Sequence, residues 1–390
     1  MTDSPGEDAR FLTRNAVEAL PEGALERQLD EGRPLRVKLG IDPTAPDIHL
    51  GHTVVLRKLR EFQDLGHTVV LIIGDYTARV GDPSGRSATR PVLSGAEIDA
   101  NAVTFQRQAF KVLDADRTEV RRNGEWLDMA MEDLFRLTRH ATVAQLLERD
   151  DFAKRYAANE PISVLELLYP LLQGYDSVAV EADVELGGTD QKFNLLLGRQ
   201  IQQAYGMSAQ SVLTMPILPG IDGVQRMSKS LGNYVGVTEP ADEVFGKLMR
   251  VPDVAMPVYY DLLLDGDFDP DRPPVESKRA LAGALVARLH GDEAAHEAEA
   301  HFDRLHVQRE LPDEIPDHAL TANGDVVHMP AVLRDVFGLS SSEGRRLLAQ
   351  GGVKLDGEAL GGDDLDLPPA RLDGAVLQVG KRRFVRLQLG

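Results

Sequence analysis

The sequence predicts an α/β fold in which a doubly wound parallel sheet is followed by a small helical domain and a C-terminal α+β domain. Residues 35–41 have the composition of a strand, residues 51–65 follow as a helix, and residues 69–74 (VVLIIG) form an apolar run ending in glycine. Strand-helix alternation with a fully apolar second strand is typical of a parallel sheet covered by helices on both faces. The length of 390 residues exceeds what one hydrophobic core usually serves, so we expect two or three domains.

The rest of the chain divides by periodicity and composition. Residues 96–173 have a mainly helical pattern, so we expect a helical insertion within a first domain of residues 1–225. Apolar residues at helical spacing predict at least two amphipathic helices in a second domain, residues 226–310. Residues 311–329 are rich in proline and poor in apolar residues, which predicts a linker before a last domain of residues 330–390.

Composition excludes several classes of protein. Cysteine is absent, which excludes disulfides, thiolate nucleophiles and cysteine-ligated metals and favours a cytoplasmic protein. No apolar run approaches the roughly 20 residues of a membrane span, so we expect no membrane contact. A net charge of -19 would repel nucleic acid if it were evenly spread. However, residues 331–390 hold nine Lys or Arg and eight Asp or Glu, so the acidic excess lies in the first 330 residues.

The stretch KLGIDPTAPDIHLGH, residues 38–52, lies where the first predicted strand ends and a helix begins. His49 and His52 are three residues apart, so they share a face of the first helical turn, beside free backbone N–H groups and the positive end of the helix dipole. This arrangement favours phosphate oxygens, and Gly51 leaves room for a ribose or adenine to approach the backbone. The alternative is two ordinary histidines at a helix start, which an isolated HxxH pattern would favour.

A basic motif, residues 226–230 (RMSKS), lies in a stretch rich in glycine, proline and polar residues, which predicts an exposed, mobile loop. Alone it is best explained as a basic surface loop. Together, however, the two motifs resemble the HIGH and KMSKS signatures of class I aminoacyl-tRNA synthetases, in the right order and at a similar separation. The residues GIDPTA beside the first motif resemble the tyrosyl branch of that family.

Tyr169, Gln173 and Asp176 form a polar stripe on one face of a predicted helix, since they lie at positions i, i+4 and i+7. A solvated helix face is the alternative explanation. The stripe resembles the tyrosyl family, in which the first two positions contact the ammonium group of the substrate and the aspartate accepts its phenolic hydroxyl. Asp82 resembles a second carboxylate for the ammonium group, and residues 185–194 (ELGGTDQKFN) resemble the site of the ribose and the substrate carboxylate.

The resemblance thus implies three groups of site residues. Tyrosine would contact Lys38, Asp82, Tyr169, Gln173, Asp176 and Gln191. ATP would contact Gly40, Asp42, His49, Gly51, His52, Gly188, Asp190, Met227 and Lys229. Charge developing on the transferred phosphoryl group and on pyrophosphate would be stabilised by Thr44, His49, His52, Arg86, Arg90, Arg226 and Lys229.

Two residues depart from the family pattern. Lys38 replaces a tyrosine that shares the phenolic hydroxyl in the best-known tyrosyl enzymes, and Lys192 replaces a tryptophan. Lys38 has three possible roles on sequence grounds: it hydrogen-bonds the substrate hydroxyl, it pairs with Asp176 and keeps that carboxylate ionised, or it faces solvent.

The last 60 residues resemble an S4-type RNA-binding domain. Residues 339–358 (LSSSEGRRLLAQGGVKLDGE) predict a helix, a turn and a strand that opens a hairpin. The expected phosphate contacts are Arg345, Arg346, Lys354, Lys381, Arg382 and Arg383. A solvated basic face is the alternative for any one of them.

The family resemblance implies ATP-dependent activation of tyrosine and its transfer to tRNA(Tyr). It also implies a homodimer joined through the helical insertion, an anticodon-binding type of second domain, and Mg²⁺ that arrives with ATP rather than a protein-bound metal. A tryptophan enzyme, an RNA-binding paralogue without acylation and a small-molecule adenylyltransferase are the alternatives. Asp176 and the basic tail argue against the first, the intact histidines and Lys229 against the second, and residues 310–390 against the third.

Overall fold

The computed structural model describes residues 4–44, 47–83, 94–264, 266–306, 315–320, 325–380 and 383–389. Internal contacts divide the chain into two compact units, Met1–Glu299 and Ala300–Gly390. Within the described segments, no helix combines the length and the apolar composition needed to cross a bilayer.

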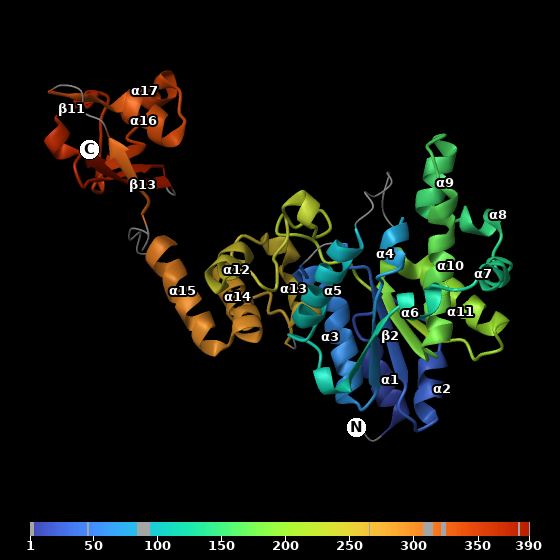
Figure 1. The fold of residues 1–390 in the computed structure, drawn as a ribbon. Coiled ribbons are helices and arrows are strands. Elements are labelled where there is room, and N and C mark those ends of the chain that lie inside the picture. Colours follow the sequence, from blue (N-terminus) through green and yellow to red (C-terminus); the bar gives the residue numbers. More distant parts are fainter. Residues whose placement is uncertain are drawn as a thin grey trace. The chain divides into compact units, whose positions relative to one another are not determined.

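The first unit contains a six-stranded sheet in which five neighbouring strands are parallel and only the edge strand β1 is antiparallel (Figure 1). In spatial order the strands are β1 (Glu18–Leu20), β6 (Ser211–Met215), β5 (Val184–Gly188), β2 (Arg36–Ile41), β3 (Thr68–Ile73) and β4 (Thr118–Arg122). The predicted parallel sheet is therefore confirmed.

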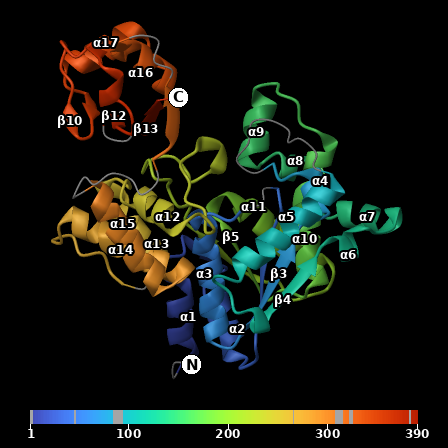
Figure 2. The same cartoon turned by 60° about the vertical axis from the view of Figure 1, so that its left-hand side comes forward.

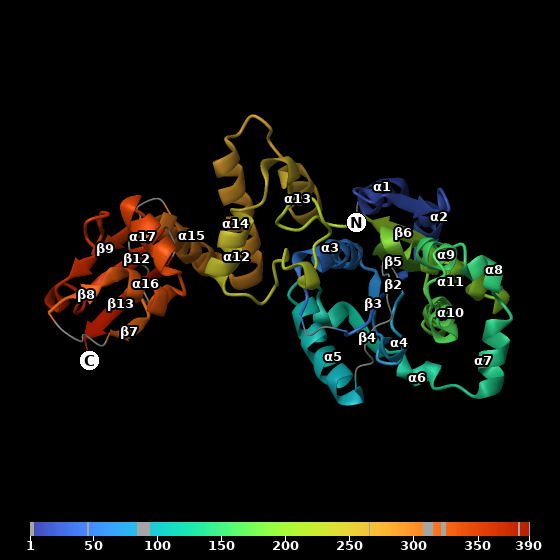
Figure 3. The ribbon, with the colours of Figure 1, turned by 90° about the horizontal axis from the view of Figure 1, so that it is seen from above.

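Helices cover both faces of this sheet, as the apolar strands predicted. Helices α3 (Leu50–Asp64) and α5 (Gly95–Ala109) lie on one face, and α10 (Val164–Ala179) and α11 (Lys192–Ala204) lie on the other (Figure 3). From β2 the chain runs outward to β3 and β4, and it later returns to the opposite side of β2 to form β5 and β6. Such a reversal of strand order opens a crevice at the carboxyl ends of the strands, where ligands bind in doubly wound folds.

The stretch predicted as a helical insertion is only partly an insertion. Its first helix, α5, and strand β4 belong to the sheet layers, and the sequence analysis did not predict β4. All five residues of β4 (TEVRR) are only half-buried, so this edge strand carries no alternating apolar pattern. Short helices follow it, and Figure 1 shows them beside α10. They are α6 (Gly124–Leu127), α7 (Met131–Thr138), α8 (Val143–Leu146) and α9 (Asp150–Ala157).

Four helices follow the sheet in the chain, and the two predicted near residue 276 and beyond are confirmed. Helices α12 and α13 both pack against α14, and α13 also contacts α3 (Figure 2). The phenol of the buried Tyr259 in α13 donates a hydrogen bond to the carbonyl of Pro219 at 2.8 Å, which anchors the preceding loop. Their bounds are α12 (Ala241–Leu248), α13 (Met256–Leu263), α14 (Pro274–His290) and α15 (Asp292–His306).

Beyond α15, the described residues of the second unit form a five-stranded sheet, in the order β10-β9-β12-β13-β7, with two helices and a separate strand pair, β8 with β11. The predicted helix, turn and hairpin are confirmed as α17, β9 and β10. The expected linker is corrected: it contributes β7, which pairs with β13 in parallel, and β8. These strands are two to four residues long, too short for a sequence pattern to indicate. The bounds are β7 (Asp317–Leu320), β8 (Val327–His328), α16 (Met329–Phe337), α17 (Ser341–Ala349), β9 (Val353–Leu355), β10 (Glu358–Ala359), β11 (Asp366–Leu367), β12 (Val376–Val379) and β13 (Arg383–Leu389).

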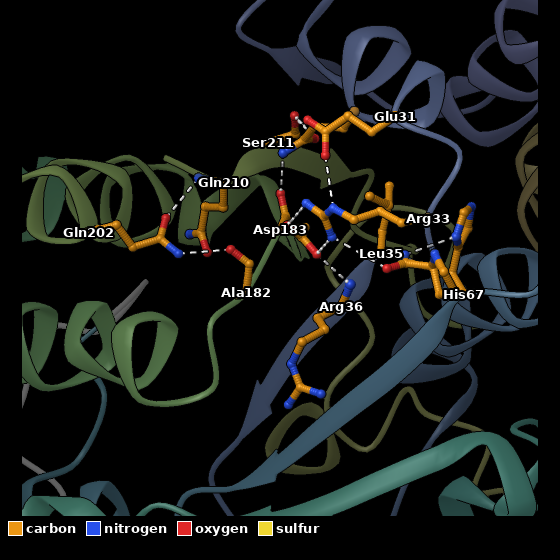
Figure 4. A network of polar contacts seen from close by, with 12 residues as sticks. Glu31, Arg33, Leu35, Arg36, His67, Ala182, Asp183, Gln202, Gln210 and Ser211 are labelled. Atoms are coloured by element: carbon orange, nitrogen blue, oxygen red, sulfur yellow. Dashed lines mark hydrogen bonds and ion pairs between the residues drawn. The ribbon is translucent and has the colours of Figure 1, made fainter. Parts of the chain in front are cut away.

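Polar contacts around Asp183 tie together the amino ends of three strands of the first unit (Figure 4). The carboxylate of Asp183 accepts two hydrogen bonds from Arg33, at 2.8 and 2.7 Å, and one from the backbone N–H of Arg36 at 2.8 Å. Its carbonyl accepts a bond from the backbone of Ser211 at 2.8 Å. Because these contacts lie at the end of the sheet opposite the crevice, they serve the fold.

Candidate active site

The two histidines of the first motif lie where helix α3 begins, as predicted. His49 is the N-cap residue, and its Nδ1 accepts a hydrogen bond from the backbone of Gly51 at 3.1 Å. The Nδ1 of His52 accepts one from the backbone of His49 at 3.2 Å, and the two ring centroids are 4.0 Å apart. Since each Nδ1 is an acceptor, a neutral ring carries its proton on Nε2, and both histidines can donate from that nitrogen.

Both imidazoles are neutral near pH 7. Burial is the main cause: it lowers the pKa of His49 to about 2 and that of His52 to about 4. The charge of Lys229 lowers both values further. The helix start therefore offers two neutral N–H donors and a positive helix dipole, which suit an anionic oxygen.

Gly51 is required by its neighbours. A Cβ atom at this position would lie 2.9 Å from Cε1 of His49 and 3.7 Å from Cβ of Met227. The first distance is too short for real side chains, so any other residue would push the His49 ring out of place. The sequence analysis expected Gly51 to make room for a ligand, and the described residues that fill this space are His49 and Met227.

The two signature segments are joined through their backbones. The N–H of Leu50 donates to the carbonyl of Val235 at 2.9 Å, and the N–H of Val237 donates to that of Ile48 at 3.0 Å. Asn233 supports the RMSKS segment, because its Oδ1 accepts from the backbone of Ser228 at 2.8 Å. Sequence reasoning missed Asn233, which lies just after the motif in a stretch expected to be irregular.

The polar stripe of α10 contacts the carboxyl end of β2. The hydroxyl of Tyr169 donates to Asp42 Oδ2 at 2.9 Å, and Thr77 donates to Asp42 Oδ1 at 2.7 Å. Burial raises the pKa of Tyr169 well above its usual value, so the hydroxyl remains a donor. Asp42, at the end of β2, therefore connects the first motif to the stripe.

Gln173 belongs to a chain of amide and carboxylate contacts. Its Oε1 accepts from Asn194 at 2.8 Å, and Asn194 also donates to Oε1 of Gln191 at 3.1 Å. Gln191 in turn donates to Asp82 Oδ2 at 2.9 Å. Arg149, which is 5% exposed, donates to Asn194 at 2.9 Å. The structure thus brings together Asp82, Gln173 and Gln191 as expected. It adds Asn194, from the predicted stretch 185–194, and Arg149, which was not predicted from the sequence.

Asp176 lies buried at the end of the stripe. Its carboxylate accepts a hydrogen bond from Nε1 of Trp126 at 2.8 Å and one from Nδ2 of Asn123 at 3.3 Å. Burial raises the pKa of Asp176 to about 6, although Lys38 and these two donors oppose the shift. A buried carboxylate that keeps acceptor capacity at neutral pH suits a hydroxyl donor. Asn123 and Trp126 were also missed, because their segment was predicted only as a break and a helix.

Comparison with known proteins decides the family. A family model described as tRNA synthetases class I (W and Y) matches residues 30–306. The tyrosine–tRNA ligase of Moorella thermoacetica is 50% identical over 395 residues, covering 97% of this chain and 95% of that protein. The tyrosine–tRNA ligase of Thermotoga maritima is 49% identical, covering 99% and 98%. This chain belongs to the class I tyrosyl-tRNA synthetase family.

Solved structures of tyrosyl-tRNA synthetases share the fold. The C-terminally truncated mitochondrial tyrosyl-tRNA synthetase of Aspergillus nidulans matches with a TM-score of 0.65 at 21% identity, over 78% of this chain and 94% of that chain. The tyrosyl-tRNA synthetase of Archaeoglobus fulgidus, solved with L-tyrosine, matches with a TM-score of 0.63 at 24% identity, over 76% and 99%.

Of the three roles expected for Lys38 in a tyrosyl-tRNA synthetase, only part of one is found. Its charge lowers the pKa of Asp176 and so favours the ionised carboxylate, although the two groups are not paired. Lys38 is completely buried, so the solvent-facing role is wrong. Its Nζ forms an ion pair with Glu185 at 2.8 Å rather than with Asp176, and it also donates to Ser177 at 2.8 Å and to the carbonyl of Gln173 at 3.0 Å. Those three partners leave it no proton for a substrate hydroxyl. Glu185 lies in a motif that sequence analysis assigned to the ribose site, and its buried role was missed.

The other departure from the tyrosyl-tRNA synthetase pattern lies on the surface. Lys192 forms an ion pair with Glu18 of β1 at 2.5 Å, and its side chain is 45% exposed. The charge of Lys192 is thus paired with β1 and not with the buried stripe of α10. In this chain the described donors to Asp176 come from Trp126 and Asn123 instead.

Further predicted residues of the synthetase site lie at the carboxyl ends of the strands. Gly40 is exposed near the end of β2, and the backbone N–H of Thr44 donates to the carbonyl of Asp42 at 2.8 Å. Gly188 ends β5, and a Cβ atom there would lie 2.7 Å from Oδ1 of Asp190. Burial raises the pKa of Asp190, and the positive charge of Arg226 opposes this shift. Arg226 therefore lies near the Asp190 carboxylate. Arg86 and Arg90 lie outside the described residues.

Four predicted RNA contacts lie on the surface of the second unit. Arg345 and Arg346 are exposed on α17, Lys354 is exposed on β9, and Arg383 is exposed at the start of β13. The guanidinium of Arg383 lies 5.5 Å from the ring centroid of Phe337. Lys381 and Arg382 lie outside the described residues.

Proposed function

We propose that this chain activates L-tyrosine with ATP to form tyrosyl-adenylate and pyrophosphate, and then transfers tyrosine to the 3′ end of tRNA(Tyr). The observation that carries the proposal is the buried Asp176, on the helix whose Tyr169 bonds Asp42 of the first signature stretch. The Asp176 carboxylate accepts from Trp126 and Asn123 and retains acceptor capacity for a phenol. A pocket that hydrogen-bonds a hydroxyl rejects phenylalanine strongly, a discrimination for which tyrosyl enzymes are themselves the standard example.

Substrate tyrosine would be held at both ends. Tyr169, Gln173 and Asp82 would contact its ammonium group, and Asp176 would accept its hydroxyl. Gln191 would contact its carboxylate from the start of α11. These groups already bond one another through Asp42 and Asn194, so binding would exchange fixed partners rather than order free side chains.

ATP would lie across the carboxyl ends of β2 and β5, with the nucleoside against Gly40, Asp42, Gly51, Gly188, Asp190 and Met227. Tyrosine carboxylate would attack the α-phosphorus in line, with pyrophosphate leaving on the opposite side. Positive and donor groups would then stabilise the charge on the departing oxygens. This set comprises Thr44, His49, His52, Arg86, Arg90, Arg226 and Lys229. Mg²⁺ would enter with ATP as part of the substrate.

The second unit would bind tRNA phosphates through Arg345, Arg346, Lys354, Lys381, Arg382 and Arg383. The helices after β4 would join two copies in a homodimer, since Met131 and Phe135 of α7 are 62% and 57% exposed. Exposed apolar side chains of this size are typical of a protein interface. The substrates of this reaction favour a cytoplasmic enzyme.

Pyrophosphate exchange measured separately with each of the twenty amino acids tests the proposal. We expect exchange with tyrosine and at most a trace with phenylalanine and tryptophan. Asp176→Asn is the matched variant, because it keeps the shape of the side chain and alters its hydrogen bonding and charge. Exchange that depends on another amino acid would contradict the proposal, and exchange with tyrosine that is unchanged in Asp176→Asn would contradict the assignment of the hydroxyl site.

A further inference from the structure

Lys229 of the RMSKS segment forms an ion pair with a carboxylate. Its Nζ donates to Oδ2 of Asp47, a residue two positions before the N-cap His49. The side chains of Lys229 and Asp47 are 26% and 39% exposed, so the pair is open to solvent and to a ligand. No role was predicted for Asp47 from the amino-acid sequence.

The side chain of Gln108 orients the Asp47 carboxylate. The Oδ1 of Asp47 accepts a hydrogen bond from Nε2 of Gln108 at 3.4 Å, and the same Gln108 side chain accepts the backbone N–H of Ile48 through Oε1. Gln108 is only 2% exposed and lies on α5, which packs on the same face of the sheet as α3. A buried amide on a helix thus fixes the position of this carboxylate next to the His49 cap.

The ammonium group of Lys229 also lies beside an aromatic ring. Its Nζ is 5.8 Å from the ring centroid of Tyr234, and that ring is 6.3 Å from the ring of His49. Lys247 lies over the same Tyr234 ring at 5.0 Å and pairs with Glu239 at 2.7 Å. Lys229 is therefore held close to the imidazoles on which the proposed phosphate site is built.

We infer that Asp47 is a positioning residue for Lys229: it holds the ammonium group at the mouth of the site while the site is empty and releases it to the triphosphate when ATP binds. The inference rests on the proposed role of Lys229 at the phosphates. A carboxylate and a phosphate oxygen compete for one ammonium group, so the Asp47 pair opposes ATP binding. In the transition state Lys229 is on the phosphates whether or not Asp47 is charged.

The test is a double-mutant cycle between Asp47→Asn and Lys229→Met, read by single-turnover adenylate formation at varied ATP and saturating tyrosine. The only tryptophan of the chain, Trp126, contacts Asp176 and provides the fluorescence signal. We expect Asp47→Asn to tighten the apparent Kd for ATP about threefold to fivefold, the range of a partly exposed ion pair. In the Lys229→Met background the same substitution should change that Kd by less than about twofold, because the paired ammonium group is gone. The rate constant at saturating ATP should stay within about twofold in Asp47→Asn.

Glu239→Gln is the matched control, since it removes the same charge from a carboxylate that pairs with Lys247 over the same ring. It should change neither the Kd for ATP nor the rate. If Asp47→Asn changed the Kd for ATP equally with and without Lys229→Met, Asp47 would act only by repelling the ATP phosphates. That result would overturn the inference. A large fall in the saturated rate, with Kd unchanged, would overturn it too, because Asp47 would then act in the transition state. If Lys229→Met alone changed neither the Kd for ATP nor the saturated rate constant, the proposed role of Lys229 would fail, and the inference would fail with it. If Lys229→Met does impair the reaction but shows no coupling to Asp47→Asn, only the inference about Asp47 fails.

Discussion

Lys38 of β2 and Glu185 of β5 lie opposite each other in the parallel sheet, and their side chains form an ion pair of 2.8 Å that is completely buried. The pair lies at the point where the strand order reverses, beneath the crevice. Because Lys38 also bonds Ser177 and the carbonyl of Gln173, it fastens α10 to the sheet. The β2 position that serves the hydroxyl in the best-known tyrosyl enzymes serves the scaffold here.

Lys38→Met should destabilise the first unit by about 3–5 kcal/mol, because it leaves the carboxylate of Glu185 buried without its counter-charge. Urea unfolding monitored by circular dichroism measures the loss. The double variant Lys38→Met with Glu185→Gln should lose only about 1–2 kcal/mol, since no isolated charge remains. Equal losses in the single and double variants would show that the ion pair is not what stabilises this region.

The preference for tyrosine over phenylalanine should fall as the pH drops through 6. Asp176 has a pKa raised from 3.8 to about 6, so it is ionised above that pH and protonated below it. The ratio of kcat/KM for the two amino acids should therefore decrease by about tenfold per pH unit below 6, and using the ratio cancels titrations common to both substrates. In Asp176→Asn the ratio should be low at every pH. A ratio that stays constant between about pH 5 and pH 8 in the unmodified enzyme would contradict the assignment.

His49→Ala and His52→Ala should slow adenylate formation while tyrosine affinity stays nearly unchanged. Each should raise the barrier by about 2–4 kcal/mol, the value of one donor that acts on developing charge. Because both rings are neutral above pH 4, the rate should show no histidine titration near neutral pH. Single-turnover kinetics separates rate from affinity, and His296→Ala, on the exposed surface of α15, is the control. A loss in tyrosine affinity alone would place the two histidines in the other half of the site.

A chain that ends at His306 should retain pyrophosphate exchange and lose most tRNA charging. The cut removes β7 and β8 with the rest of the second unit, which a cut at residue 330 would have divided. In the full chain, Arg345→Ala with Arg346→Ala should weaken tRNA binding and reduce its salt dependence by about one counterion for each phosphate that is no longer neutralised. Equal loss of exchange and charging in the shortened chain would mean that the second unit supports the catalytic fold.

The sequence predicted the elements that have a strong pattern. Strands β2 and β3 and helix α3 between them carry apolar periodicity or continuous apolar runs, and each appears within a residue or two of its expected bounds. Helix α17 appears within the stretch that predicted it. Strand β4 was missed because an edge strand that is half-buried on both faces needs no alternation. The short strands β7 and β8 acquire their structure from partners distant in the chain, which no local window contains.

The site could be predicted only where its residues belong to a motif. His49, His52 and the α10 stripe were identified from spacing, and the structure places them at the carboxyl end of the sheet. Arg149 and Trp126 join the site through tertiary contacts from separate segments, so no spacing indicates them. Asn194 lies in the predicted stretch 185–194, but no role was predicted for it. Lys38 shows the converse: its position was identified and its partner was not, because Glu185 is 147 residues away in the chain and becomes a neighbour only when β2 and β5 pair.

The backbone hydrogen bonds between residues 48–50 and 235–237 fix the position of the chain just after the RMSKS segment. Val235 and Val237 are almost completely buried, so motion of Lys229 must be taken up within the few residues that precede Val235. Consecutive Cα atoms are about 3.8 Å apart, so one residue inserted or deleted between Lys229 and Val235 would displace the ammonium group by more than the length of a hydrogen bond. The number of residues between Lys229 and Val235 therefore determines how far the side chain of Lys229 reaches.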